Sequence, residues 1–298
     1  MTNIVLLDGS IGQELVKRTG DRATPLWSTQ VMMDTPDAVG AVHADYFAAG
    51  ATVASTNTYA VHRSRLDRVG LDDQLLPLLD IALAQANAAR DAHGSGRIAG
   101  CLGPLLASYR PDLHPDVTLA KLRFGEVAAH MAPHVDLLLI ETVSSLQEGE
   151  GALSGVMGHG KPVWIAFTVM DTDGTRLRSG EPLQDILPLI ARHKPQAVLI
   201  NCSKPEAIAA GLPTLAQTGL PFGAYGNGFV EISQEFLKDA PTVDTLRQRQ
   251  DLTPDTYADI AMSWVKHGAT IIGGCCEVGP AHIAELARRL RAAGHVLI

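Results

Sequence analysis

The stretch Ala197-Val198-Leu199-Ile200-Asn201-Cys202-Ser203 is a short apolar run that ends abruptly in polar residues. The stretch Thr270-Ile271-Ile272-Gly273-Gly274-Cys275-Cys276 repeats this form later in the chain. Short continuous apolar runs are typical of strands that are buried on both faces of a parallel sheet. Each stretch therefore predicts a buried strand with thiols at its carboxyl end.

Further runs of the same kind alternate with amphipathic stretches of helical spacing along the whole chain. The predicted strands cover residues 4–7, 52–55, 97–101, 135–140, 163–168, 197–200, 222–225 and 270–272. The predicted helices include residues 37–49, 73–93, 119–132, 253–267 and 279–293. Eight strand–helix units predict an α/β fold of the (β/α)8 or TIM barrel type. An open doubly wound sheet is the alternative. We expect a single barrel domain over residues 1–298.

The composition suits a large core and excludes some partners. Of the 298 residues, 46% are hydrophobic and 19% are charged, with a net charge of −8. An acidic chain is not expected to bind nucleic acid or an anionic membrane surface. No apolar run reaches the roughly 18 residues of a membrane span, and the amino-terminal run is too short for a signal peptide. We expect a cytoplasmic protein.

Cys202, Cys275 and Cys276 follow the ends of predicted strands six and eight, which face the same side of a barrel. Neighbouring cysteines do not easily bridge each other, but their thiolates can hold one metal ion. With the third sulfur they would form a set with one open position, as in catalytic zinc sites, and thiolates favour Zn²⁺. Ordinary buried thiols are the alternative. Cys101 lies inside a predicted strand, so we assign it to core packing.

Two carboxylates, Asp8 and Glu141, stand at the ends of predicted strands one and four. Glu141 follows an apolar strand, and a carboxylate at that depth needs a cation. Together they could hold the ammonium of an amino acid, whereas helix capping or surface ion pairs are the alternative. The histidines, including His43, form no metal-binding spacing, so we expect them at the surface or hydrogen-bonded.

Residues 223–252 form the least regular segment, and we interpret it as a long active-site loop that follows strand seven. The chain has no G-x-G-x-x-G opening a helix after strand one and no phosphate-binding loop. Nicotinamide and nucleotide cofactors are therefore not expected.

The chain resembles the homocysteine S-methyltransferase family over nearly its full length. The resemblance lies in Leu7-Asp8-Gly9, Gly12, Leu26-Trp27-Ser28, residues 43–51, Thr56-Asn57-Thr58-Tyr59, Glu141-Thr142, Asn201-Cys202-Ser203 and Gly273-Gly274-Cys275-Cys276. It implies a (β/α)8 barrel, a zinc ion held by the three matching cysteines, and homocysteine bound through its amino group by Asp8 and Glu141. Residues that match the same motifs are expected to line the substrate site: Gly9, Asn57, Tyr59 and Asn201.

The expected reaction is methyl transfer from a sulfonium or quaternary ammonium donor, S-methylmethionine first among them, to homocysteine, giving methionine. The donor side departs from the family pattern. Tyr225-Gly226-Asn227 stands where the S-methylmethionine branch has Tyr-Pro-Asn, and Thr142 replaces a tyrosine of the betaine branch. Asn227 is a candidate fourth zinc ligand in the resting state. Trp27, Tyr59 and Tyr225 are candidates for cation–π contact with the donor.

Three other functions stay open at this point. The barrel could bind zinc and a thiol amino acid without turnover, or it could methylate another thiol such as selenocysteine. A metal-dependent lyase or aldolase is the third. The open metal position argues against storage, and no lysine stands at a strand end to form the Schiff base of one aldolase class.

Overall fold

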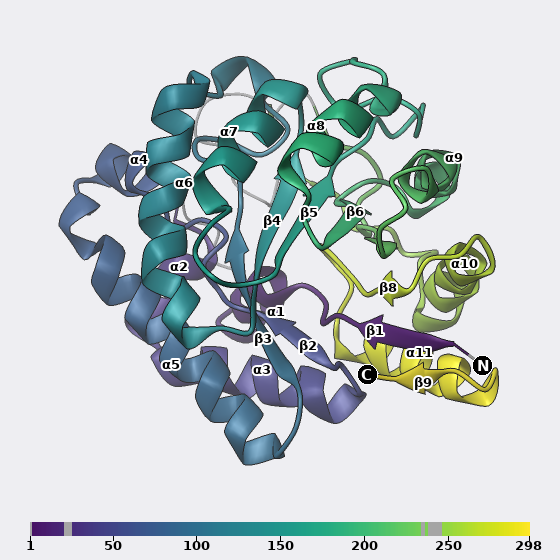
Figure 1. Ribbon diagram of the computed structural model, residues 1–298. Coiled ribbons are helices and arrows are strands. Elements are labelled where there is room, and N and C mark those ends of the chain that lie inside the picture. The colour runs from purple at the N-terminus through teal and green to yellow at the C-terminus, as the bar shows by residue number, and fades with distance from the viewer. Residues whose placement is uncertain (1, 21–25, 234–235, 238–245) are drawn as a thin grey trace.

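The computed structural model describes residues 2–20, 26–233, 236–237 and 246–298. Its strands are β1 (Asn3–Leu6), β2 (Val53–Ser55), β3 (Arg97–Leu102), β4 (Leu137–Val143), β5 (Val163–Phe167), β6 (Ala197–Asn201), β7 (Phe222–Tyr225), β8 (Ile271–Ile272) and β9 (Val296–Leu297). Its α-helices are α1 (Ile11–Arg18), α2 (Ser28–Asp34), α3 (Pro36–Ala49), α4 (Arg63–Leu66), α5 (Leu75–His93), α6 (Val117–Met131), α7 (Leu146–Val156), α8 (Ile186–His193), α9 (Pro205–Ala216), α10 (Pro254–Lys266) and α11 (Pro280–Ala292). Figure 1 shows the helices as an outer layer around the strands.

The parallel strands close into a barrel, as the sequence predicted. Strands β2 to β8 pair in chain order, and β8 pairs with β1. The ring closes where Leu7 bridges Val53 and the amide of Asp8 donates to the carbonyl oxygen of Val53 at 3.0 Å. Strand β9, which the sequence did not predict, extends the sheet beside β1, so the first and last strands lie side by side in Figure 1.

Alternate residues of each strand enter two separate cores, because successive side chains of a strand point to opposite faces. One set packs against the helices, with Leu138 and Ile140 of β4 as examples. The other set, which includes Leu137 and Leu139, fills the barrel interior. The inward set therefore continues to Glu141 at the carboxyl end of β4, where barrel enzymes place their chemistry.

Several helices begin with the caps that their sequences provide. Ser145 accepts a hydrogen bond from the amide of Glu148, and Asp116 accepts one from Leu119. A proline opens each of α3, α9, α10 and α11, where its missing amide hydrogen carries no cost. Ser10 caps α1 directly after β1, which fixes the turn that carries Asp8 and Gly9.

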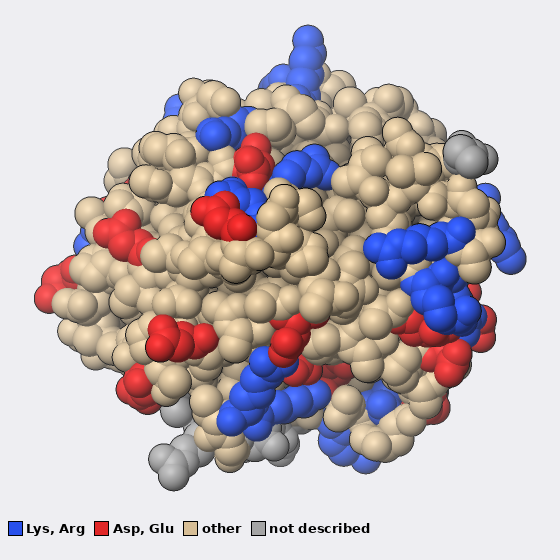
Figure 2. Space-filling model, turned by 90° about the horizontal axis from the view of Figure 1, so that it is seen from below, with Lys and Arg blue, Asp and Glu red and all other residues tan. Residues whose placement is uncertain are grey.

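Among the residues described, no helix is long and apolar enough to cross a membrane. Figure 2 shows one face of the molecule, on which basic and acidic side chains are interspersed. The net charge of −8 is therefore not gathered into a patch of one sign on that face.

The expected surface or hydrogen-bonded position is wrong for His43. Its side chain on α3 is fully buried, and neither ring nitrogen has a hydrogen-bond partner in the part of the chain that the structure describes. The helical pattern of residues 37–49 was right, but it does not distinguish the face of the helix that meets the core. Burial lowers the pKa of His43 to about 4, because an imidazolium loses its hydration there.

We expect this histidine to make the fold sensitive to acid. The unfolded chain binds a proton near the ordinary pKa of about 6.5, whereas the folded chain binds it only near 4. Stability is therefore complete above pH 6.5 and falls between pH 6.5 and 4, by about 2 kcal/mol at pH 5. Urea unfolding at pH 8 and pH 5 measures this loss. His43→Leu should remove this part of the loss, whereas His62, which is also buried with a lowered pKa, keeps its own part. His267→Gln, at an exposed position, should change nothing; an equal loss in all three proteins contradicts the assignment.

Candidate active site

A cavity of about 420 Å³ opens at the carboxyl ends of the strands. Much of the cavity floor is formed by the residues that point into the barrel at the carboxyl ends of the strands. These residues are Ser55, Cys101, Glu141, Asn201, Tyr225 and Cys275, with Asp8 and Cys202 beside them. The cavity therefore gathers residues from both ends of the sequence.

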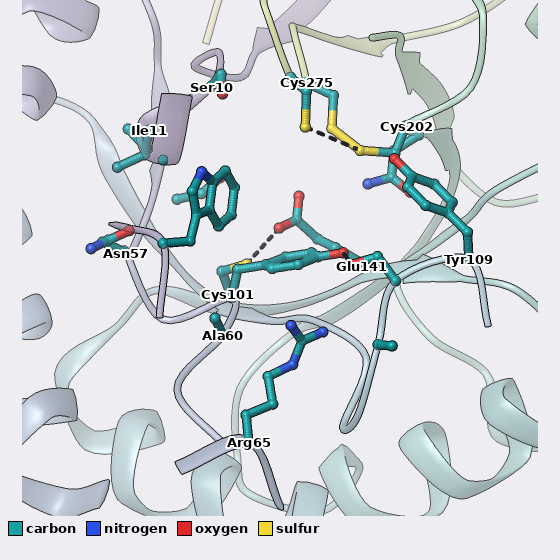
Figure 3. A pocket seen from close by; sticks show the side chains of 18 of the residues that line it. Ser10, Ile11, Asn57, Ala60, Arg65, Cys101, Tyr109, Glu141, Cys202 and Cys275 are labelled. Atoms are coloured by element: carbon teal, nitrogen blue, oxygen red, sulfur yellow. Dashed lines mark hydrogen bonds between the residues drawn. A yellow bond between two sulfur atoms is a disulfide. The ribbon is translucent and has the colours of Figure 1, made fainter. Parts of the chain in front are cut away.

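The cysteine cluster, Cys202, Cys275 and Cys276, lies on one side of this cavity (Figure 3). The three sulfur atoms lie within 4.8 Å of one another. The end of β7 aligns the two segments, because Tyr225 accepts a hydrogen bond from the amide of Cys202 and Gly226 accepts one from Cys275. The backbone of Cys202 is left-handed, with φ at 47°, which turns its thiol toward the β8 loop.

Two of the three sulfurs are joined in this structure. Cys202 and Cys275 form a disulfide, whereas the sequence predicted three free thiols. The third sulfur, of Cys276, lies 4.0 Å from that of Cys202. The same proximity explains both states, because thiols that converge on one point can bond to each other when they are oxidised.

The donor set fits a tetrahedral thiolate metal site. Zinc–sulfur bonds of about 2.3 Å place neighbouring sulfurs about 3.8 Å apart, close to the 4.0 Å between Cys202 and Cys276. Burial, followed by repulsion from Glu277 and Glu141, raises the pKa of Cys276 to about 12. A thiolate here therefore needs a nearby cation, and a divalent metal supplies one.

Asp8 is almost fully buried beside the cysteine cluster, at 2% exposure. Its carboxylate accepts hydrogen bonds from the amide of Ser55 at 2.6 Å and from the hydroxyl of Ser55 at 3.0 Å. Burial raises the pKa of Asp8 well above its usual range, the Ser55 bonds lower it, and the charge of Glu141 raises it further. The two carboxylates therefore lie close enough to repel each other.

Glu141 faces the same cavity and is held by two donors. Tyr225 donates its hydroxyl to Oε1 at 2.8 Å, and Cys101 donates its thiol to Oε2 at 2.5 Å. Burial raises the pKa of Glu141, and these bonds oppose the shift. No lysine or arginine of the described residues forms an ion pair with Glu141 or Asp8, so the pair lacks a protein cation.

The assignment of Cys101 to core packing was incomplete. It is buried, at 2% exposure, but it lines the cavity and bonds to Glu141, as Figure 3 shows. The signal was present in the sequence, because Ala99 and Cys101 share the inward face of β3. Tyr225 was considered as a cation–π residue, and its hydroxyl instead fixes Glu141.

Asn201 holds the backbone next to Glu141 in place. Its side-chain oxygen accepts from the amide of Thr142 at 2.9 Å, and its amide nitrogen donates to the Thr142 hydroxyl at 3.1 Å. Thr142 is left-handed, with φ at 61°, and the register of β4 shifts between Ile140 and Val143. Asn201 thus stabilises the bulge that presents Glu141 to the cavity.

The other predicted substrate residues also line the cavity. Gly9 has no room for a side chain, because a Cβ would stand 2.0 Å from the carbonyl oxygen of Val278. The amide of Asn57 donates to the carbonyl of Ser28 at 3.3 Å, and the hydroxyl of Tyr59 bonds to that of Ser108 at 2.8 Å.

Asn227, the candidate fourth metal ligand, is buried at 1% exposure behind the cysteine loops. Its oxygen accepts from the amide of Phe229 at 3.3 Å, and its amide nitrogen has no partner within the described ranges. The oxygen that was expected to face the metal is therefore hydrogen-bonded to the backbone of Phe229. Metal ligation by Asn227 stays a prediction.

Aromatic side chains form the rest of the wall. Trp27 meets Tyr59 edge to face, with ring centroids 6.2 Å apart, and Tyr109 lies across the cavity near the cysteine cluster. The described part of the predicted 223–252 loop adds apolar side chains, namely Phe229, Phe236 and Leu246. Residues 234–235 and 238–245 of that segment lie outside the described residues. Tyr109 was not predicted, because no strand end points to it.

Known proteins resemble this chain in sequence and in fold. A family model of homocysteine S-methyltransferase matches residues 5–290. The homocysteine S-methyltransferase of Escherichia coli (strain K12) is 31% identical, over 96% of this chain and 95% of its own. Crystal structures of the homocysteine methyltransferase MmuM from Escherichia coli, in a metallated form and in an oxidized form, each superpose with a TM-score of 0.80 at 30% identity, covering 96% of both chains.

Proposed function

The chain belongs to the homocysteine S-methyltransferase family, whose enzymes methylate the thiol of homocysteine to give methionine, and we propose that its donor is a sulfonium or quaternary ammonium compound, with S-methylmethionine preferred. The observation that supports the proposal most is one cavity that combines three sulfurs with two carboxylates, neither of which pairs with a cation in the described ranges of the chain. This combination suits an acceptor with a thiol at one end and an ammonium at the other.

The proposed metal is zinc, held by Cys202, Cys275 and Cys276 after reduction of the disulfide. Sulfur ligands favour zinc over magnesium or calcium, and three protein ligands leave one position open. When bound, zinc would lower the pKa of the acceptor thiol so that it ionises at neutral pH, and the three thiolates would keep that sulfur nucleophilic.

Asp8 and Glu141 are proposed to bind the ammonium of homocysteine. Their raised pKa values reflect burial without a counter-ion, and an ammonium between them would favour the ionised forms. Tyr225 and Cys101 occupy one oxygen each of Glu141 and leave further lone pairs free. The carboxylates thus orient the acceptor with its thiol toward the cysteine cluster.

The transfer itself is a displacement at the methyl carbon. The bond from the methyl group to the donor sulfur breaks, and its electron pair stays on that sulfur, which becomes a neutral thioether. A new bond forms between the methyl carbon and the homocysteine sulfur, whose proton passes to solvent. Charge disperses in this step, so the aromatic wall of Trp27, Tyr59 and Tyr109 favours it. Holding both reactants in line supplies much of the rate.

The decisive test is a donor panel with the reduced, zinc-loaded protein. Homocysteine is incubated with S-methylmethionine, S-adenosylmethionine, betaine or dimethylsulfoniopropionate, and methionine is quantified. We expect methionine from S-methylmethionine at the highest rate. A faster rate with another donor would correct the donor. No methionine from any donor, with methylation of selenocysteine instead, would favour that acceptor, and no product at all would favour a binding protein.

A further inference from the structure

Arg65 places a guanidinium in the wall of the same cavity (Figure 3). Its Nε and Nη2 both donate to the carbonyl oxygen of Pro104, at 3.0 and 2.8 Å, and the group stands 5.7 Å from the ring centre of Tyr59. Nη1 has no hydrogen-bond partner among the residues that the structure describes. These contacts fix the orientation of the guanidinium and leave one edge open to the cavity.

This cation has no acidic partner within ion-pair distance in the described part of the chain. The acid whose charge acts on it is Glu148, which is buried at 3% exposure and accepts from the amide of Ser144. Burial raises the pKa of Glu148 to about 8, so this carboxyl is mostly protonated at pH 7. A partly desolvated guanidinium without a counter-ion favours an anion, and its planar fork suits a carboxylate.

The neighbours of Arg65 differ from those of the proposed ammonium site. The guanidinium of Arg65 bonds to Pro104 and faces the ring of Tyr59. Glu141 instead bonds to Cys101 and Tyr225. The carboxylate and ammonium of homocysteine share one carbon atom. A carboxylate at Arg65 is therefore assigned to a second bound molecule.

We propose that Arg65 binds the carboxylate of the methyl donor and so selects donors that carry a carboxylate beyond their onium centre. The inference rests on the proposed methyl transfer and deepens it on the donor side. S-methylmethionine, betaine and dimethylsulfoniopropionate all have this character, whereas trimethylsulfonium does not. Tyr59 adjoins the guanidinium, so the onium end lies toward the aromatic wall and the cysteine cluster.

The test is a double-mutant cycle between enzyme and donor. The enzyme is wild type or Arg65→Gln, and the donor is S-methylmethionine or its carboxamide, which keeps the sulfonium and loses the negative charge. We expect kcat/KM of wild type to be roughly 10–100-fold higher for the carboxylate, as for other hydrogen bonds to charged groups. Arg65→Gln should lower the value for S-methylmethionine by the same factor and leave that for the carboxamide and for trimethylsulfonium unchanged. Arg65→Lys should recover part of the difference.

Arg63→Gln is the matched control, because Arg63 lies on the same short helix and pairs with Glu126 outside the cavity. It should preserve the preference between donors. An equal loss for both donors in Arg65→Gln would show a structural role, and a raised KM for homocysteine would place the acceptor carboxylate there; either result overturns the inference. Failure of the proposed function is distinct, because wild type would then form no methionine from any donor, and both proposals would fall.

Discussion

Replacing Cys202 or Cys276 with serine is expected to abolish metal binding and to lower methyl transfer by at least about 100-fold. Even residues that only orient a metal ligand commonly account for roughly 10–100-fold in affinity or activity. Each variant removes one of the three sulfurs that lie within 4.8 Å of one another. Metal analysis of the reduced protein should give about one zinc per chain for wild type, and far less for the variants. Methionine formation is measured on the same samples.

Cys101→Ser is the control for this experiment, since Cys101 is the remaining cysteine and lies at Glu141 instead of in the cysteine cluster. It should keep the full metal content. Wild type that has been oxidised should bind little metal and recover after a reductant is added, because Cys202 and Cys275 are then free. Normal zinc content in Cys202→Ser and Cys276→Ser would refute the three-sulfur site.

Glu141→Gln is expected to lower kcat/KM for homocysteine by roughly 10–100-fold, because a hydrogen bond to a charged group is worth about 1.5–3 kcal/mol. The amide keeps the shape of the side chain and its contact with Tyr225, but it cannot balance an ammonium. The informative comparison is 4-mercaptobutanoate, which is homocysteine without its amino group. Wild type should prefer homocysteine strongly, and the variant should lose most of that preference.

Glu148→Gln is the matched control, because it changes a buried carboxyl group that lies outside the cavity lining. It should preserve the preference for homocysteine over 4-mercaptobutanoate. Asp8→Asn should behave like Glu141→Gln, because both carboxylates are proposed to contact the same ammonium. An unchanged preference in Glu141→Gln and Asp8→Asn alike would exclude them from amino-group recognition, whatever the effect on the overall rate.

The sequence predicted the barrel well because its signals are local. Apolar runs such as Val163–Phe167 are long enough to specify a buried strand, and their polar ends specify which residues meet at the carboxyl face. The β4 strand was placed slightly early, since a left-handed Thr142 and a register shift continue it past Glu141 to Val143. Such a bulge depends on Asn201, a residue far away in the chain, and no local pattern shows it.

The alternation of strands and helices could be predicted from the sequence alone. So could the grouping of three cysteines at one end of the barrel and the approach of Asp8 and Glu141 to one cavity. Those features follow from the two-residue period of strands and from the common direction of parallel strand ends. The partners followed only from the tertiary structure: Ser55 on Asp8, Cys101 and Tyr225 on Glu141, and Arg65 in the cavity wall with no counter-ion among the described residues. Which side chains pair depends on the distances between them and on how far each is desolvated. Both are fixed only when the barrel has closed.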